Sequence, residues 1–163
     1  MQASGPWAQG ADVIQRLLDE GRLERRAQSS EEEVERMFGN AAADLASARR
    51  EKDSNPRLAY RAMYDAVRTA LTAALEKQGL RVKGGEGSHV VVFLAVSAQV
   101  GPNVTRQLLR SYDRMRNRRH QVEYDNLDVT AADVFDDLPK AERMVAGIRA
   151  FTARLSRWEP GRQ

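Results

Sequence analysis

The sequence contains no cysteine, which excludes disulfide bonds and any metal site built from thiolates. Aromatic residues make up only 6% of the chain, and both tryptophans, Trp7 and Trp158, lie near its ends. No apolar run approaches the length of a membrane span, and the first residues lack the pattern of a signal peptide. We therefore expect a protein of the prokaryotic cytoplasm that has no membrane segment, no metal ion and no cofactor.

The composition is typical of a single globular domain. The chain has 163 residues, of which 42% are hydrophobic and 30% are charged. These values fit one core surrounded by helices with solvated outer faces. Residues 1–10 contain glycine and proline without periodicity and are expected to form a flexible tail. One domain is expected over residues 11–157, followed by a second short tail over 158–163.

Apolar residues recur at helical spacing along most of the chain. Ser30 with Glu33 has the spacing of a capping box, as does Thr130 with Asp133, and Ser88 is expected to cap another helix. The expected helices cover residues 11–20, 30–52, 56–78, 88–100, 103–124 and 130–158. No segment is assigned to a strand, although the valine-rich residues after Ser88 also suit one. The predicted fold class is all-α, an up-and-down four-helix bundle with an additional short N-terminal helix.

Two local features interrupt these helices. Pro139 is expected to kink or split the last helix near Leu138. Residues 80–87 contain three glycines, which can form a phosphate cradle. The Gly-Lys-Ser/Thr pattern and the preceding strand of a nucleotide-binding loop are both absent, so a mobile connector is the favoured interpretation.

Positive charge is concentrated in one segment. Residues 106–120 carry six arginines and one aspartate, a net charge of +5, whereas the whole chain carries +3. The remaining residues therefore sum to about −2, the difference between these two values. A clustered positive face attracts phosphates more strongly than dispersed charge does, so the segment indicates an anionic partner.

On a helical wheel this basic segment has one apolar face. Its members are Val104, Leu108, Tyr112, Met115 and Val122. Arg119 falls near the centre of that face, where a leucine would be expected, and Arg116, His120 and Glu123 lie along one edge. An arginine in this position must find acceptors or line a cavity, because an unpaired buried charge costs several kcal/mol.

Two interpretations of Arg119 remain open. It lines a functional site, or it forms a buried salt bridge with Glu123, Asp65 or Glu33. Arg114 and Arg118 point away from the apolar face, and with Arg110 they are expected to form a solvated face. A further set of residues is expected to be structural: Tyr60 and Tyr64 in the core, and His89 in a capping or loop-packing position at a helix N-terminus.

The order of helices and two short motifs resemble a known family. Residues 59–68 read Ala-Tyr-Arg-Ala-Met-Tyr-Asp-Ala-Val-Arg, and after a glycine-rich loop with Ser-His-Val the sequence Arg-Asn-Arg-Arg-His-Gln-Val-Glu-Tyr covers 116–124. Over residues 11–155 this pattern resembles the HEPN domains, small all-helical proteins of prokaryotic toxin–antitoxin and phage-defence systems.

The resemblance implies a metal-independent ribonuclease that works as a homodimer. Many members use an arginine, four to six arbitrary residues and a histidine, facing the same motif of a second subunit. Arg114 and His120 match this spacing, but on the wheel Arg114 lies about 120° from His120. Arg116, Arg119 and His120 are therefore the predicted catalytic residues, with His120 as base or acid and the arginines stabilising the phosphorane. The predicted substrate-binding residues are Arg114, Asn117, Arg118, Glu123, Tyr124 and His89.

The same resemblance also allows a protein without catalysis. Arg119 and Tyr124 resemble the arginine and tyrosine pattern of family members that have lost activity and serve as partners of a minimal nucleotidyltransferase. Such a partner, an antitoxin, could modify Tyr124. Sequence-specific DNA binding is less favoured, because the arginine helix faces the core in part and no helix-turn-helix spacing precedes it.

Overall fold

The computed structural model describes residues 9–100, 102–126 and 128–159, with residues 102–109 described as backbone only. This part of the chain forms six helices and two short strands. In chain order they are α1 (Ala11–Asp19), β1 (Leu23–Arg25), α2 (Glu31–Glu51), α3 (Pro56–Lys77), β2 (Leu80–Val82), α4 (Ser88–Ser97), α5 (Pro102–Tyr124) and α6 (Ala131–Thr152). The predicted all-α class is confirmed at this level.

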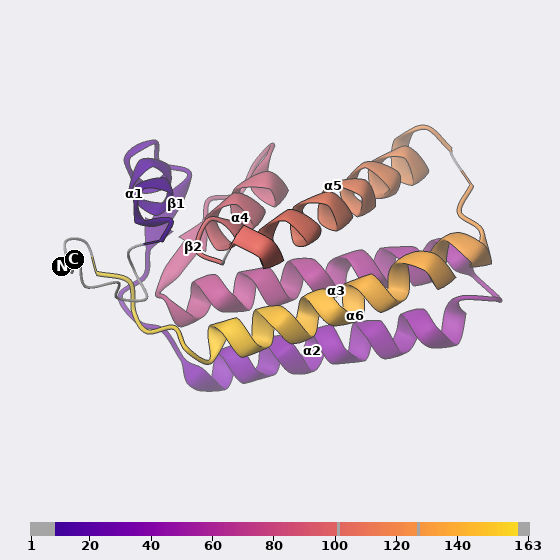
Figure 1. The fold of residues 1–163 in the computed structure, drawn as a ribbon, viewed down its shortest axis with the longest axis horizontal. Helices are drawn as coiled ribbons and strands as arrows, with labels where there is room; N and C mark the ends of the chain where they lie inside the picture. Colours follow the sequence, from indigo (N-terminus) through magenta and orange to yellow (C-terminus); the bar gives the residue numbers. More distant parts are fainter. Residues whose placement is uncertain (1–8, 101, 127, 160–163) are drawn as a thin grey trace.

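The four long helices run in alternating directions, so that α2, α3, α5 and α6 form an up-and-down arrangement (Figure 1). Helix α3 is central, since it contacts α2, α4, α5 and α6. The short helices α1 and α4 lie at one end of the bundle (Figure 1). As a consequence, any group on the inner face of α3 lies within reach of both α4 and α5.

The two strands were not expected from the sequence. β1 and β2 pair antiparallel, with Leu23 opposite Val82 and Arg25 opposite Leu80. The prediction of no strand is therefore wrong at these positions, and part of the expected glycine-rich connector is extended. A strand of three residues is too short to display an alternating pattern, and the buried Leu23 and Leu80 side chains stabilise the pair through the core.

Helix boundaries test the capping predictions directly. Thr130 with Asp133 forms a reciprocal capping box, as predicted. Ser30 accepts a hydrogen bond from the Glu33 amide, but the Glu33 carboxylate binds Arg36, so only half of the predicted box is present there. The prediction for Ser88 is wrong, because the N-cap of α4 is Gly87, with a left-handed φ of 79°. Glycine adopts this conformation without steric cost, and it moves the start of the helix back by one residue.

Pro139 does not divide the last helix. α6 continues as one helix from Ala131 to Thr152, so the expected split is absent and the helix ends before Trp158. Proline at this position removes a single hydrogen bond, to the carbonyl of Phe135. Phe135 is 69% exposed, so the proline lies one turn beyond a residue on the solvent side of the helix.

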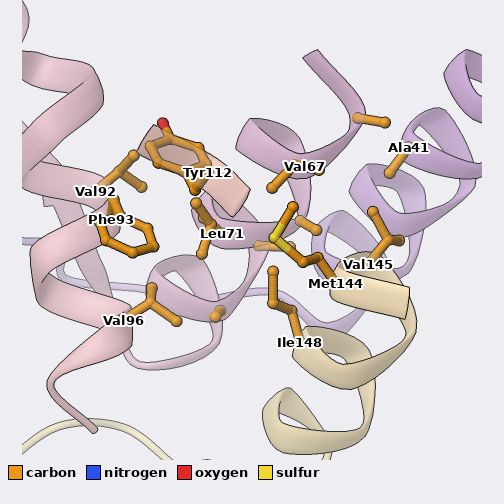
Figure 2. Packing of buried hydrophobic residues seen from close by; sticks show 14 of the residues in the cluster. Ala41, Val67, Leu71, Val92, Phe93, Val96, Tyr112, Met144, Val145 and Ile148 are labelled. Carbon is orange, nitrogen blue, oxygen red and sulfur yellow. The ribbon is translucent and has the colours of Figure 1, made fainter. Parts of the chain in front are cut away.

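The core lies where α3 meets α2, α4, α5 and α6. Figure 2 shows Phe93 and Tyr112 beside Leu71, with Met144 and Ile148 of α6 on the other side. The Phe93 and Tyr112 rings stack with their centroids 4.5 Å apart. The Tyr112 hydroxyl points away from this apolar cluster (Figure 2), toward the polar groups described below.

Trp158 also belongs to the core, although the sequence places it at the start of a tail. Its side chain is only 6% exposed, and its amide donates to the Gln78 carbonyl at 2.8 Å. The Arg25 guanidinium lies 4.9 Å from the centre of the indole ring. The chain therefore stays packed to at least residue 158.

Candidate functional site

The basic helix α5 packs with the face that the wheel predicts. Tyr112 and Met115 are buried, and Val122 is partly buried against the core. The side chains of Val104 and Leu108 lie outside the described residues. Arg119 is on the same face, and its side chain is 23% exposed. A guanidinium is thus held at the boundary between core and solvent.

Of the two interpretations of Arg119 that the sequence left open, the structure shows the salt bridge. It forms an ion pair with Glu123 at 3.1 Å, and its guanidinium lies 5.2 Å from the centre of the Tyr64 ring on α3. Of the three carboxylates considered, Glu123 is the one that pairs with it, while Glu33 pairs with Arg36. Its Nε atom is buried without a hydrogen-bond partner, so pairing leaves part of its binding capacity unused.

Arg116 lies one turn before Arg119 and faces the same region. Its ion pair with Asp113 is long, at 3.6 Å, and its side chain is 38% exposed. The Nε atom of Arg116 is likewise buried without a hydrogen-bond partner. Both side chains are partly exposed, so the outer nitrogens of these guanidiniums can reach an anionic ligand, while the buried Nε donors stay unsatisfied within the protein.

A chain of hydrogen bonds links three helices beside these arginines. Nδ1 of His89, in the first turn of α4, lies 2.9 Å from the Tyr64 hydroxyl. The Tyr64 hydroxyl lies 3.2 Å from the hydroxyl of Tyr112 on α5. The Tyr112 hydroxyl in turn donates to the His89 carbonyl at 3.1 Å. These three residues therefore tie α3, α4 and α5 together through polar contacts at the edge of the core.

The direction of donation in these hydrogen bonds determines the tautomer of His89. Because the one Tyr112 proton goes to the His89 carbonyl, the Tyr64 hydroxyl must donate to Tyr112. Tyr64 then has no proton left for His89, so Nδ1–H of His89 donates to the Tyr64 oxygen. In a neutral imidazole this leaves the lone pair on Nε2, which lies 3.4 Å from a guanidinium nitrogen of Arg68.

The surroundings favour the neutral form of this histidine. Burial lowers the pKa of His89 below its ordinary value of 6.5, and the positive charges of Arg68, Arg119 and Arg116 lower it further, against the opposing effect of Asp65. Burial also raises the pKa of Tyr64 and, more strongly, that of Tyr112, so both phenols stay protonated. At neutral pH the group is an uncharged base next to fixed positive charges.

We call this group the Tyr–His–Arg cluster. Its members are Tyr64 and Arg68 from α3, His89 from α4, and Tyr112, Arg116 and Arg119 from α5. It offers an imine nitrogen that can accept a proton and three guanidiniums that can bind anionic oxygens. These are the groups that a phosphate ester needs for binding and for base-catalysed attack.

Two arginines that were expected to form a solvated face also have structural partners. Arg114 forms an ion pair with Asp137 of α6 at 3.0 Å, and Arg118 pairs with Asp133 at 2.9 Å and with Asp137 at 3.9 Å. Asp137 is only 2% exposed and also accepts a hydrogen bond from the Tyr60 hydroxyl at 3.0 Å. Arg114 is half exposed, as the solvated-face prediction has it, and Arg118 is 31% exposed, but both also neutralise a buried carboxylate, which the sequence did not predict.

The other predicted site residues lie near the exposed end of α5. Asn117, His120 and Tyr124 are exposed, and the His120 ring lies 4.7 Å from the Tyr124 ring. Within the described residues, no hydrogen bond or ion pair joins His120 to the Tyr–His–Arg cluster. The structure thus brings together three of the predicted residues, Arg116, Arg119 and His89, and leaves His120 and Arg114 outside that group.

Sequence reasoning missed Arg68 and the polar role of the tyrosines. Tyr64 was predicted to be buried, and it is 1% exposed, but its hydroxyl belongs to the polar chain. Arg68 follows Tyr64 by four residues and so lies on the same face of α3. The sequence does carry a signal for this pair. It is a tyrosine followed four residues later by an arginine, on a helix whose inner face is otherwise apolar.

No group of three or more histidine, aspartate or glutamate side chains suited to a metal ion occurs among the described residues. No helix in the described part of the chain is long and apolar enough to cross a membrane. No family model, curated protein or solved structure matches the chain. The geometry of the cluster is therefore the main guide to its chemistry.

Proposed function

We propose that the protein is a metal-independent endoribonuclease of the HEPN type, active as a homodimer in a toxin–antitoxin or phage-defence system. The observation that supports this most is the convergence of Arg68, Arg116 and Arg119 on a neutral His89. A positive site with a neutral base at its centre suits transfer at a phosphodiester, where negative charge develops on the phosphorane oxygens.

In the proposed reaction, the RNA 2′-hydroxyl attacks the adjacent phosphorus. Arg68 moves from Nε2 of His89 to a phosphate oxygen when RNA binds. Nε2 then takes the hydroxyl proton while the bond from the 2′-oxygen to phosphorus forms. The bond from phosphorus to the 5′-oxygen breaks, leaving a 2′,3′-cyclic phosphate and a 5′-hydroxyl. Arg116 and Arg119 bind the equatorial oxygens, for which planar guanidinium donors are well suited.

The leaving 5′-oxygen needs a proton, and one cluster supplies one imidazole only. His120 is the other histidine of the chain, and its exposed ring on α5 is available to the cluster of a facing subunit. The proposal therefore assigns His89 as the base and His120 of the second subunit as the acid. Each of the two symmetric sites then contains His89 from one subunit and His120 from the other.

A helical module without catalysis is the second candidate. The three large hydrophobic side chains that are most exposed among the described residues are Leu58, Tyr124 and Phe135, at 47%, 70% and 69%. They come from the start of α3, the end of α5 and the first turns of α6, which lie at one end of the bundle (Figure 1). Exposed apolar side chains at one end favour a protein partner such as a minimal nucleotidyltransferase, to which Tyr124 would be accessible.

Cleavage of total or transfer RNA by the purified protein in EDTA tests the two candidates. The wild type should cleave, and Arg116→Ala or Arg119→Ala should reduce the rate by about a hundredfold or more. His89→Ala and His120→Ala should each reduce it by about a hundredfold to ten-thousandfold. Arg110→Ala, an exposed arginine of the same helix, is the matched control and should cleave at nearly the wild-type rate.

The outcomes separate the candidates. Inert wild-type protein with these substrates would refute the ribonuclease and leave the binding module. Activity that survives His89→Ala but not His120→Ala would move the base from His89 to His120. Mass analysis of the product ends checks the chemistry, since attack by the 2′-hydroxyl requires a cyclic phosphate.

A further inference from the structure

A cavity of about 350 Å³ lies beside the Tyr–His–Arg cluster, between the start of α3 and the end of α5. Arg119 lines the cavity and also lies 5.2 Å from the Tyr64 ring, so the two sites share one guanidinium. The Arg57 guanidinium donates to the Val122 carbonyl at 3.3 Å and joins the two helices at this point. A ligand whose anionic group binds at Arg119 can therefore extend directly into the cavity.

The walls of this cavity combine apolar surface with positive charge. Leu58 is 47% exposed and Val122 is partly buried, so each presents apolar surface to the cavity. Arg57, Arg61 and Arg119 supply three guanidiniums, against the one carboxylate of Glu123, which leaves a net charge of +2. The preferred ligand is thus anionic and has a flat or compact apolar part.

Glu123 holds the arginines at this site without saturating them. It pairs with Arg119 at 3.1 Å, but its separation from Arg61 is 3.7 Å, longer than a hydrogen bond. Arg61 is 61% exposed on its side chain and remains able to bind a phosphate. Positive charge continues from the cluster through Arg119 to Arg61, since Arg119 belongs to the cluster and both arginines line the cavity.

We propose that this cavity holds the nucleoside next to the phosphate that reacts in the cluster, with its base against Leu58 and Val122 and its outer phosphate on Arg57 and Arg61. This inference rests on the proposed function. The volume falls in the range of small-ligand sites, about 300–1,000 Å³, and bases of single-stranded RNA are bound by this combination of apolar contact and charge. A protein partner would need a much larger contact, of about 1,000 Å² or more.

Binding of a labelled 2′-fluoro RNA pentanucleotide tests the proposal, because this probe lacks the attacking hydroxyl and stays intact. Fluorescence anisotropy is measured for the probe and for five versions, each with one base removed. The abasic version that lacks the base held in the cavity should bind wild-type protein about tenfold more weakly than the complete probe does. Leu58→Ala should weaken binding of the complete probe about tenfold and leave binding of that abasic version unchanged, since the same contact is missing in both.

Phe135→Ala is the matched control, because Phe135 is also exposed at this end of the bundle but does not line the cavity. It should bind every probe as the wild type does. Free adenosine monophosphate, run in parallel, distinguishes a strand from a mononucleotide, and should compete with the pentanucleotide only at much higher concentration. Thermal unfolding of each variant verifies that the fold is intact.

Wild-type affinity for the complete probe in Leu58→Ala would overturn the nucleoside site, and so would equal losses for all abasic versions. No measurable binding of the pentanucleotide by wild-type protein would do so as well. Failure of the proposed function gives a different result, because wild-type protein would then leave all-ribose RNA intact after incubation. RNA that is cleaved normally by Leu58→Ala, with unchanged affinity, would instead assign Leu58 to a protein interface.

Discussion

Nδ1 of His89 lies 2.9 Å from the hydroxyl of Tyr64, and this contact places the imidazole proton on Nδ1 because the Tyr112 hydroxyl donates to the His89 carbonyl. The tyrosine is buried in the core helix α3, so its position is set by packing rather than by any ligand. The histidine is thereby held with Nε2 unprotonated and near Arg68. A base that is oriented before its substrate arrives loses less entropy on the way to the transition state.

Replacing Tyr64 with phenylalanine should lower ribonuclease activity without changing substrate affinity. The variant keeps the ring in the core but removes the oxygen that accepts the Nδ1 proton, so the imidazole can rotate or change tautomer. We expect kcat to fall by about tenfold to a hundredfold with KM nearly unchanged. Steady-state kinetics on a short RNA measure both constants. An equal change in kcat for Tyr60→Phe, whose hydroxyl contacts Asp137 instead, would contradict a specific role for Tyr64.

The lowered pKa of His89 predicts how stability depends on pH. The folded protein binds the imidazole proton less tightly than the unfolded chain, so unfolding takes up a proton in mildly acid solution. The contribution to the free energy of unfolding is complete above 6.5, the ordinary pKa, and is lost as the pH falls through the lower folded value. Thermal unfolding at about pH 7.5 and about pH 5.5 should show a smaller decrease in Tm for His89→Gln than for wild type. Equal decreases in the two proteins would show that His89 does not contribute.

Ribonuclease activity should depend on the same group. A base must be unprotonated, so the acid limb of the kcat/KM profile should have its midpoint below 6.5, the ordinary histidine value. The measurement is the initial cleavage rate across the acid range at constant ionic strength. A midpoint above 6.5 would indicate a histidine in a different environment and would remove His89 from the role of base.

The sequence predicted the helices better than their contacts, for a physical reason. A repeat of apolar residues gives the inner face of a helix, and Tyr112, Met115 and Val122 lie on the predicted face of α5. A wheel does not tell which neighbour a residue on the outer flank meets. Arg114 is exposed as expected, but the sequence did not predict its contact with Asp137, which lies 23 residues later on α6.

The cluster itself depends on distances that no local pattern encodes. His89 meets Tyr64 across 25 residues and Tyr112 meets Tyr64 across 48. These contacts follow from how α4 and α5 pack on α3, which local sequence spacing cannot give. The charge concentration in α5 was visible in the sequence, and so were Arg119 as the residue that breaks the apolar pattern and Arg116 at the edge of that face.

Asp137→Asn should destabilise the protein. The carboxylate is buried and accepts from the Tyr60 hydroxyl, while Arg114 and Lys140 form ion pairs with it at 3.0 and 3.3 Å. Removing its charge leaves the cations close together without their counterion, and we expect a loss of about 2 kcal/mol in the free energy of unfolding. Urea denaturation measures this loss. Asp136→Asn, at the exposed neighbouring position, is the control and should change it by less than about 0.5 kcal/mol.

Gly10→Ala should also destabilise the protein, through backbone contact rather than charge. Gly10 has a φ of 79°, and a Cβ added there would lie 2.5 Å from the carbonyl oxygen of Ala98 at the end of α4. Left-handed strain and the clash together should cost about 3 kcal/mol. Gly21→Ala is the matched control, since Gly21 has a φ of 67° with nothing within 4 Å of the added atom, and it should cost only the strain, about 1 kcal/mol. Urea denaturation of both variants separates the two effects. Equal losses would mean that the segment before α1 moves away from Ala98 at little cost, and that α1 is not held firmly against the end of α4.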